Sequence, residues 1–381
     1  MLREICHHED PTRPVTCGVC SMSNANASGF AEALDVVGYN GGGGSVFMYD
    51  EDHAKYPDRK MFASEVPHTW QTRGVYRTKS YMRVRDRDKS PHPRDVGMPV
   101  PDLTEEEVFT GFSDRYSSSY DNYGVRISAR DSWRLTRDLP FVAGEFRWTG
   151  FDYLGETMGW PNRLWNFGII DTCGFPKDTY FFCKSQWTDT PMVHLLPHWT
   201  WPGKEGVTIP VWCYTNLPEV ELFLNGRSLG RRTMGREMYL SWDVPYEAGE
   251  LRAVGDADGK SVECVVTTAG EPAALELALE GESLAADGVD VLHATIRVLD
   301  ASGNFVPTAA SEIELAVTGA GRLIGMDNGD PVSHEGYAGP VRSAFHGMCL
   351  GIVQAGREAG EIEITARSGA LSPATAAILV R

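Results

Sequence analysis

Lys60-Met61-Phe62-Ala63-Ser64-Glu65 is a short apolar run that ends in an acid, and it indicates the fold class of the first half of the chain. Similar apolar runs occur at 14–18, 35–39 and 142–148, separated by helical or loop segments. Strands that alternate with helices in this way are typical of a parallel α/β barrel. We therefore predict four parallel strands, with a helix at about 126–137 before the last one.

A long polar stretch, roughly 77–122, lies between the last two predicted strands and is rich in Pro, Arg and Asp. Loops of this length within a compact domain are commonly functional. Since the loops of a barrel gather at its mouth, we expect this one to form a wall of a pocket.

The second half of the chain changes to short strands in which apolar and polar residues alternate, which is typical of antiparallel β-sandwiches. The change begins after about Pro191, and Asn225-Gly226 is a hairpin signal within it. Beyond Gly270-Glu271-Pro272 the aromatic residues thin out, and the pattern indicates an immunoglobulin-like module. The strands predicted in this half are 209–215, 220–224, 239–244, 292–299, 312–317 and 361–366.

The bulk composition excludes some classes of partner. In 381 residues, 42% hydrophobic content is ample for several cores. The formal net charge of −17 disfavours binding to nucleic acid or to an anionic membrane surface. No run of about 18 apolar residues occurs, and residues 1–16 lack the apolar core of an export signal. We expect a carbohydrate partner, no nucleic acid and no membrane, and we leave the compartment open between cytoplasm and periplasm.

The eight cysteines are scattered along the chain and do not form the dense framework of a disulfide-stapled module, so we expect free thiols. Cys17-Gly18-Val19-Cys20 has the spacing of a zinc half-site. No second pair follows at the expected distance, and His7 and His8 lie in a predicted helix. We expect neither a metal nor a cofactor.

Glu65 is the most informative carboxylate because it ends a predicted barrel strand. The carboxyl ends of barrel strands converge on the active site, so this acid is expected to face a substrate. The alternative is a surface acid or a helix cap at the start of a loop. Tyr39 ends a neighbouring predicted strand, where its hydroxyl is expected to hydrogen-bond Glu65 and keep it ionised, unless it only packs the barrel.

Aromatic and acidic residues follow the last predicted strand. Trp148 ends that strand and offers a flat apolar face to the C–H surface of a sugar, or else caps the barrel core. The residues that either line the same mouth or pack its rim are Trp160, Trp165 and Phe167. With Tyr39, we predict that Trp148, Asp152 and Trp165 bind the substrate.

Several longer motifs occur in order along the chain. They are Phe62-Ala63-Ser64-Glu65, Gln71-Thr72-Arg73-Gly74-Val75-Tyr76, and the runs 144–156, 167–178, 193–199 and 220–226. Together these resemble the bacterial β-galactosidases of glycoside hydrolase family 2. The resemblance covers most of the chain, and the order of several long motifs makes it specific.

The resemblance implies a retaining double displacement, in which one carboxylate attacks the anomeric carbon and another acts as general acid and then base. The two carboxyl groups must lie about 5–5.5 Å apart. Glu65 matches the family's nucleophile at the end of the seventh barrel strand. Trp148 matches the tryptophan that floors the sugar pocket, and Tyr39 resembles the tyrosine that orients the nucleophile.

The resemblance also implies an architecture that joins an α/β part to all-β parts. Residues 1–190 correspond to the carboxy-terminal half of a TIM (β/α)8 barrel, with strands five to eight. Residues 191–270 correspond to a β-sandwich. Residues 271–381 correspond to an immunoglobulin-like, invasin-like β-sandwich.

The chain departs from the family at the general acid/base. In these enzymes that glutamate follows an asparagine at the end of the fourth strand, and the chain contains no Asn-Glu dipeptide. We expect the isolated chain to be a poor enzyme and its coding sequence to extend upstream. Because a half barrel leaves open sheet edges, we expect a homo-oligomer or another chain to cover it. Gly41 to Gly44 replace a loop that usually bears side chains, which places subsite contacts there in doubt.

The substrate has more than one reading. Family glucuronidases carry an Asn-x-Lys clamp after the eighth strand, and 171–178 lacks it, which favours a β-galactoside and leaves a mannoside or fucoside open. The alternative function is a catalytically inactive remnant that binds carbohydrate or a cell surface through its β-modules. From Pro272 onward its aromatic residues are Phe305, Tyr337 and Phe345, a thin stacking platform.

Overall fold

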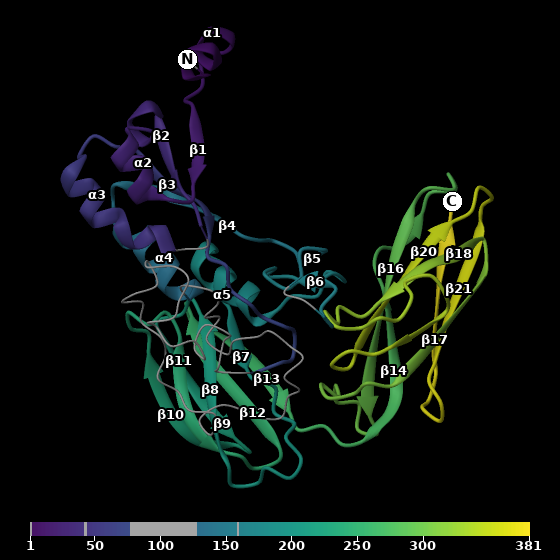
Figure 1. Ribbon diagram of the computed structural model, residues 1–381. Coiled ribbons are helices and arrows are strands. Elements are labelled where there is room, and N and C mark those ends of the chain that lie inside the picture. Colours follow the sequence, from purple (N-terminus) through teal and green to yellow (C-terminus); the bar gives the residue numbers. More distant parts are fainter. Residues whose placement is uncertain (1, 42–43, 77–127, 158–159) are drawn as a thin grey trace. The chain divides into compact units, whose positions relative to one another are not determined.

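The computed structural model describes residues 2–41, 44–76, 128–157 and 160–381 (Figure 1). The chain divides into two compact units, each built from separate segments. The first contains Met1–Gln71, Val75–Asp152 and Asn166–Ile169, and the second contains Thr72–Gly74, Tyr153–Trp165 and Ile170–Arg381. The wall predicted at 77–122 lies outside the described residues.

The first unit is built on a four-stranded sheet with the order β1-β2-β3-β4, in which every neighbouring pair is parallel. Figure 1 shows the four strands side by side with helices beside them. The strands are β1 (Thr16–Val19), β2 (Val36–Tyr39), β3 (Met61–Val66) and β4 (Val142–Arg147), and the helices are α1 (Leu2–Glu9), α2 (Met22–Ser28), α3 (Tyr49–Lys55) and α4 (Ala129–Asp138), with 3-10 turns η1 (Ala31–Ala33) and η2 (Gly44–Met48). The four predicted parallel strands are confirmed, and their membership of a barrel remains a prediction.

The core of this unit lies between the sheet and its helices. Val37, Met61 and Ala63 of the central strands are fully buried, and they pack in one cluster with Met22 of α2 and Tyr49 of α3. A parallel sheet covered by helices selects such continuous apolar runs. The sheet is therefore held by the same short runs that predict it.

The second unit begins with small elements and continues into a first pair of antiparallel sheets, with orders β10-β9-β12-β13 and β11-β8-β7. Alternate residues of β9 and β11 are buried, as expected for strands with one face toward a core. Asn225 and Gly226 have φ angles of 50° and 77°, which the predicted two-residue hairpin turn requires. The elements are β5 (Tyr153–Leu154), β6 (Leu164–Trp165), α5 (Asp178–Trp187), β7 (Val193–Leu196), β8 (Thr208–Thr215), β9 (Glu219–Leu224), β10 (Arg227–Thr233), β11 (Leu240–Pro245), β12 (Glu250–Ala257) and β13 (Lys260–Thr267).

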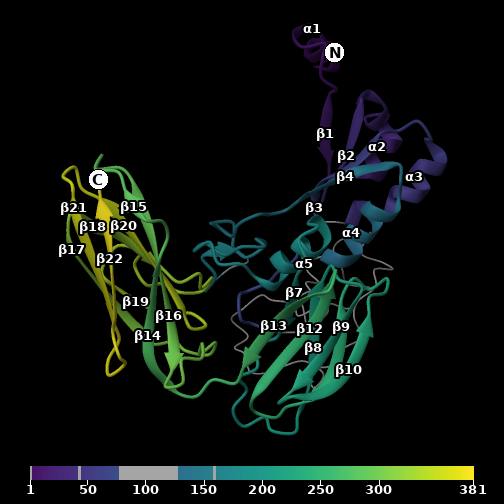
Figure 2. The same cartoon turned by 180° about the vertical axis from the view of Figure 1, so that it is seen from behind.

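The end of the chain forms a second pair of sheets, with orders β14-β16-β20-β18 and β15-β22-β21-β17-β19, which face each other in Figure 2. Their inward side chains form one apolar cluster that includes Ile296, Leu315 and Ile364. The predicted strands at 292–299, 312–317 and 361–366 are confirmed within β16, β17 and β21. The strands are β14 (Pro272–Leu279), β15 (Ser283–Leu284), β16 (Val291–Asp300), β17 (Glu312–Gly319), β18 (Gly321–Asp327), β19 (Val341–Ser343), β20 (Met348–Ala355), β21 (Gly360–Arg367) and β22 (Ala374–Val380).

Across the described ranges, no helix has both the length and the apolar character needed to span a membrane.

Candidate active site

Glu65 lies near the carboxyl end of β3, where its side chain is about 30% exposed. One carboxylate oxygen, Oε2, accepts a hydrogen bond from Asn40 Nδ2 at 3.2 Å. The other, Oε1, is 2.8 Å from His68 Nε2. These two partners leave part of the carboxylate open to solvent, so it remains available to an incoming atom.

Asn40 is oriented by its own neighbours. Ser64 Oγ donates to Asn40 Oδ1 at 3.0 Å, so the NH2 group is the part that faces Glu65. The backbone next to it is tight: a Cβ on Gly18 would lie 3.2 Å from Asn40 Oδ1, and one on Gly38 would lie 3.0 Å from Ser64 Oγ. Glycine at these two places therefore lets the amide and the hydroxyl approach each other beside the carboxylate.

Aromatic rings surround the other partner, His68. Its imidazole lies 5.0 Å from the Phe167 ring and 6.4 Å from the Trp148 indole, measured between centroids. Trp70 stacks on Phe167 at 6.0 Å with an interplanar angle of 12°. The predicted residue Trp148 is thus brought into the same neighbourhood as Glu65 through His68.

The expected hydrogen bond between Tyr39 and Glu65 is wrong. Tyr39 is fully buried, and its hydroxyl donates to Asp52 Oδ2 at 2.7 Å. Burial, followed by the Asp52 carboxylate, raises the pKa of this phenol. The physical reason is the alternation of side chains along a strand: Tyr39 points toward the helix layer, and the next residue, Asn40, points toward Glu65.

Glu145, on the adjacent strand β4, is not placed to be a second reactive carboxylate. Its Oε2 accepts hydrogen bonds from Ser132 Oγ at 3.1 Å and Thr136 Oγ1 at 3.0 Å, and both donors belong to α4. Burial between strand and helix raises the pKa of this carboxyl group. Its role in the described structure is to tie α4 to the sheet.

The other two predicted binding residues, Asp152 and Trp165, contact residues other than Glu65. Asp152 is buried, and its Oδ1 accepts from the Gly168 backbone N–H at 2.9 Å, which links the segment after β4 to the one that carries Phe167. Trp165 belongs to the second unit, where it pairs with Tyr153 in the β5–β6 hairpin. Substrate contact by Asp152 and Trp165 therefore remains a prediction.

Sequence reasoning missed Asn40 and His68. Each had a signal: Asn40 directly follows a predicted strand, and His68 lies three residues after the candidate nucleophile. Polar side chains at the carboxyl ends of parallel strands are expected to meet at one edge of the sheet. Tyr39 is the last residue of the predicted strand, and only the register of the strand shows whether it or Asn40 faces Glu65.

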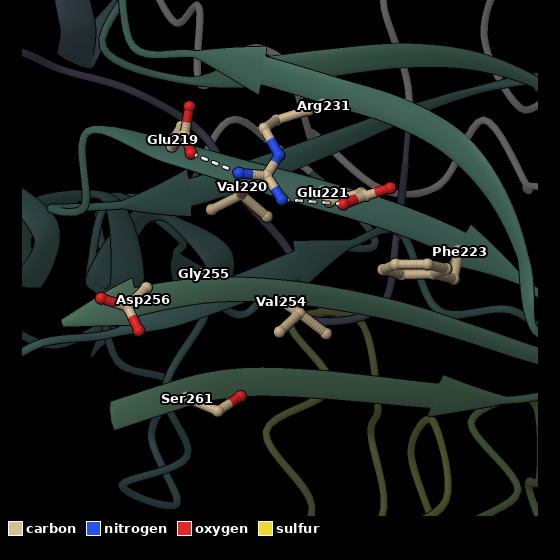
Figure 3. Close-up of a pocket in the computed structure, with 9 residues that line it drawn as sticks. All are labelled: Glu219, Val220, Glu221, Phe223, Arg231, Val254, Gly255, Asp256 and Ser261. Carbon is tan, nitrogen blue, oxygen red and sulfur yellow. Dashed lines mark hydrogen bonds and ion pairs between the residues drawn. The ribbon is translucent and has the colours of Figure 1, made fainter. Parts of the chain in front are cut away.

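A surface pocket of about 200 Å³ lies on the first sandwich of the second unit (Figure 3). Arg231 occupies part of it between Glu219 Oε1 and Glu221 Oε2, at 2.5 Å and 3.1 Å. Such exposed ion pairs contribute little energy. None of the predicted site residues lines this cavity.

The described residues contain no cluster of three or more His, Cys, Asp or Glu side chains arranged to hold a metal ion. All eight cysteines, Cys17 and Cys20 among them, are free thiols. The site is thus a carboxylate held by an amide and an imidazole beside aromatic rings. This arrangement suits nucleophilic attack on an electrophilic carbon of a flat, polar substrate.

Two family models match parts of the chain. Residues 275–377 match the model described as glycoside hydrolase family 2 C-terminal domain 5. Residues 206–263 match a domain of unknown function, DUF4982. Together they cover strands of both sandwich regions.

Relatives cover more of the chain. It is 37% identical over 380 residues to a β-galactosidase of Bacteroides ovatus, and this alignment covers 96% of this chain and 41% of that protein. It is 40% identical over 342 residues to a putative β-glucuronidase of Formosa agariphila, and this alignment covers 85% of this chain and 31% of that protein. The crystal structure of a β-glycosidase from Bacteroides vulgatus superposes with a TM-score of 0.89 at 43% identity, over all of this chain and 48% of that one. The chain therefore spans less than half the length of each of these relatives.

Proposed function

The chain belongs to glycoside hydrolase family 2, of which it matches the carboxy-terminal portion, and from this premise we propose that it supplies the nucleophile side of a retaining β-glycosidase site. The single observation that carries the proposal is Glu65 at the carboxyl end of β3, held by Asn40 and His68 with part of its carboxylate exposed. In this reading β1 to β4 are half of a (β/α)8 barrel. Residues 191–270 and 271–381 are two further β-sandwich domains.

The reaction proceeds in two displacements. In the first, a Glu65 oxygen bonds to the anomeric carbon as the bond to the leaving oxygen breaks, and a general acid protonates that oxygen. In the second, water attacks the same carbon, the ester to Glu65 breaks, and the same acid group, now a base, takes the proton from water. Two inversions give overall retention.

The residues around Glu65 have separate parts in this scheme. Asn40 and His68 hold the carboxylate in one orientation, which removes the reorganisation that a free side chain would need. The aromatic group of Trp148, Phe167 and Trp70 excludes water from one side of the site and offers apolar faces to a sugar ring. The chain contains no Asn-Glu dipeptide to match the family's general acid/base, so this proposal assigns only the nucleophile to it.

We propose a neutral β-galactoside as the substrate. The absence of Asn-x-Lys from 171–178 supports this choice, since that clamp would neutralise the carboxylate of a glucuronide. The relatives carry both names, β-galactosidase and β-glucuronidase, so both sugars belong in the test.

Covalent trapping tests the proposal. The purified chain is incubated with 2,4-dinitrophenyl 2-deoxy-2-fluoro-β-galactoside, or with the matching glucuronide, and digested for mass spectrometry. Because an activated aryl leaving group needs little protonation, the first displacement is expected to proceed without the general acid and to leave a fluorogalactosyl ester on Glu65. Glu65→Gln should block labelling, and Glu156→Gln, a matched exposed carboxylate, should leave it intact. Labelling of another residue, or none with either sugar, would contradict the proposal.

A further inference from the structure

Trp160 is the most exposed tryptophan of the chain. This residue is 83% exposed, whereas Trp70, Trp199, Trp201, Trp212 and Trp242 are buried. Exposing an indole to water forfeits most of the free energy that burial of so large an apolar surface provides. A strongly exposed tryptophan that also packs against a neighbouring ring is therefore a candidate ligand-binding residue.

The indole has a ring contact on one side. The His334 ring lies 4.3 Å from it between centroids, with an interplanar angle of 31°. His334 Nε2 in turn donates to the Pro161 carbonyl oxygen at 2.9 Å, so the imidazole is fixed to the residue next to the indole. The two rings form a pair that joins the segment before β6 to the loop after β18.

The two loops that carry this pair are also tied to each other. The Arg163 backbone N–H donates to Pro331 O at 2.9 Å, and its Nη1 donates to the carbonyl oxygens of Ser333 at 3.1 Å and Glu335 at 3.3 Å. The Arg163 guanidinium also lies over the Tyr337 ring, 5.0 Å from its centroid. The exposed pair is thus preorganised, which lowers the entropic cost of binding to it.

We infer that Trp160 and His334 form a carbohydrate-binding platform for a pyranose ring of a β-linked oligosaccharide. The axial C–H groups of such a ring present an apolar face of about the size of an indole. With Nε2 donating to Pro161 O, the neutral imidazole has Nδ1 as a hydrogen-bond acceptor for a sugar hydroxyl. An aromatic face beside one polar acceptor fits a sugar, which has both kinds of surface.

The surroundings of the pair favour a sugar over a protein. Its chain neighbours Asn162, Ser333 and Glu335 are polar. A stable protein interface needs on the order of 1,000 Å² of complementary surface with an apolar centre. One indole and one imidazole provide much less, but they match one sugar ring.

This inference rests on the proposed function for the nature of the ligand, and its test does not need catalysis. The full chain carrying Glu65→Gln is titrated calorimetrically with three probes, β-1,4-galactotetraose, cellotetraose and laminaritetraose, and with free galactose and glucose. We expect at least one tetraose to bind with a measurable affinity, and the monosaccharides show whether one ring is enough. Trp160→Ala should weaken that binding about tenfold, which is roughly 1.4 kcal/mol. Trp160→Phe should retain most of it.

Three controls separate the outcomes. Trp187→Ala removes another exposed tryptophan, 49% exposed on α5, and should leave binding within twofold. Failure of every tetraose to bind, or tetraose affinity unchanged by Trp160→Ala, would overturn the platform. A change of oligomeric state in Trp160→Ala on size-exclusion chromatography would assign the indole to a contact between copies and would also overturn it. Labelling of Glu65 by the fluorosugar is unaffected by any of these results, so the two proposals fail separately.

Discussion

Glu65 and Asp171 are carboxylates of one chain in opposite environments. The side chain of Glu65 is 30% exposed and has one amide and one imidazole partner. Asp171 is 1% exposed: its Oδ2 accepts from Arg73 Nε at 2.7 Å, and its Oδ1 accepts from the backbone N–H groups of Cys173 and Phe175, both at 2.9 Å. A carboxylate with its lone pairs occupied holds structure together, whereas one with a free face can react.

The environment of Asp171 extends through its arginine. Arg73 Nη1 donates to Phe345 O at 2.9 Å, and Nη2 donates to Asn328 O at 2.7 Å. The guanidinium therefore joins the segment at 72–74 to loops of the carboxy-terminal strands. Arg73 follows Glu65 by eight residues in the chain. One short stretch therefore contains both the candidate reactive carboxylate and the cation that pairs with the structural carboxylate, Asp171.

The largest expected effect is from Arg73→Met, which leaves the buried Asp171 charge without its cation. Breaking a buried pair in this way costs about 3–5 kcal/mol. Urea unfolding should show a loss of that size, whereas Glu65→Gln, at the partly exposed carboxylate, should cost less than about 0.5 kcal/mol. Equal losses in the two variants would erase the proposed distinction between the two acids.

Gly329→Ala should come next. A Cβ there would lie 2.3 Å from Asp171 Oδ2, and the residue has a φ of +75°, which side chains rarely adopt. We expect a loss of roughly 2–3 kcal/mol in the free energy of unfolding, from strain and from displacement of the carboxylate. Gly174→Ala is the control, because its φ is +82° but its Cβ would meet nothing within 4 Å. That variant should lose only about 1 kcal/mol, so a similar loss in both would show that the carboxylate can move freely.

The free energy of unfolding should depend on pH through His346, which lies near Arg73, the partner of Asp171. Burial, followed by the nearby Arg73 charge, lowers the pKa of His346 to about 4, and burial lowers that of His198 to about 3. The unfolded chain binds these protons near pH 6.5 and the folded chain does not, so stability present above pH 6.5 is lost as the pH falls toward 4. Between pH 7 and 5, His346 alone should account for about 2 kcal/mol.

Urea unfolding across this pH range measures the effect. His346→Gln should have a visibly smaller slope of stability against pH than the parent chain. The parent's other acids titrate in both proteins, so the difference in slope isolates His346. Parallel curves would mean that the pKa of His346 is not lowered in the folded state.

The smallest expected effect separates Tyr39 from Asn40. Tyr39→Phe removes one hydrogen bond to buried Asp52, which keeps its contacts with Asn26 and Arg59, so the loss should be about 1 kcal/mol. Its rate of Glu65 labelling by the fluorosugar should match the parent. Asn40→Ala should slow labelling about tenfold, because the carboxylate loses a positioning contact. If Tyr39→Phe slowed labelling and Asn40→Ala did not, Tyr39 and not Asn40 would be the residue that positions Glu65.

Much of the fold could be predicted because its signals are local. The runs around Val37, Met61 and Val142 needed only apolar residues at strand length, and Asn225-Gly226 needed only the φ angles of its turn. The alternation in β16 and β21 likewise follows from one buried face. Each of these patterns involves residues close together in the chain, so no knowledge of distant contacts was required.

The candidate site was predictable only in part. Glu65 and Trp148 end strands, and that position alone directs attention to them. Tyr39 and Asn40 are neighbours that face opposite sides of the sheet, and the sequence does not state which of the two faces Glu65. His68, three residues away in a loop, reaches Glu65 through a backbone path that no periodic pattern describes.

By itself, the sequence determined the parallel and antiparallel strands, the hairpin, the candidate nucleophile and the family, because all of these depend on residue type and order along the chain. Tertiary structure alone decided that Tyr39 serves Asp52, that Asn40 and His68 hold Glu65, and that Arg73 neutralises Asp171 98 residues later in the chain. The reason is physical: hydrogen bonds and charge pairs between distant segments form only when packing brings them within about 3 Å, and packing is a property of the whole fold.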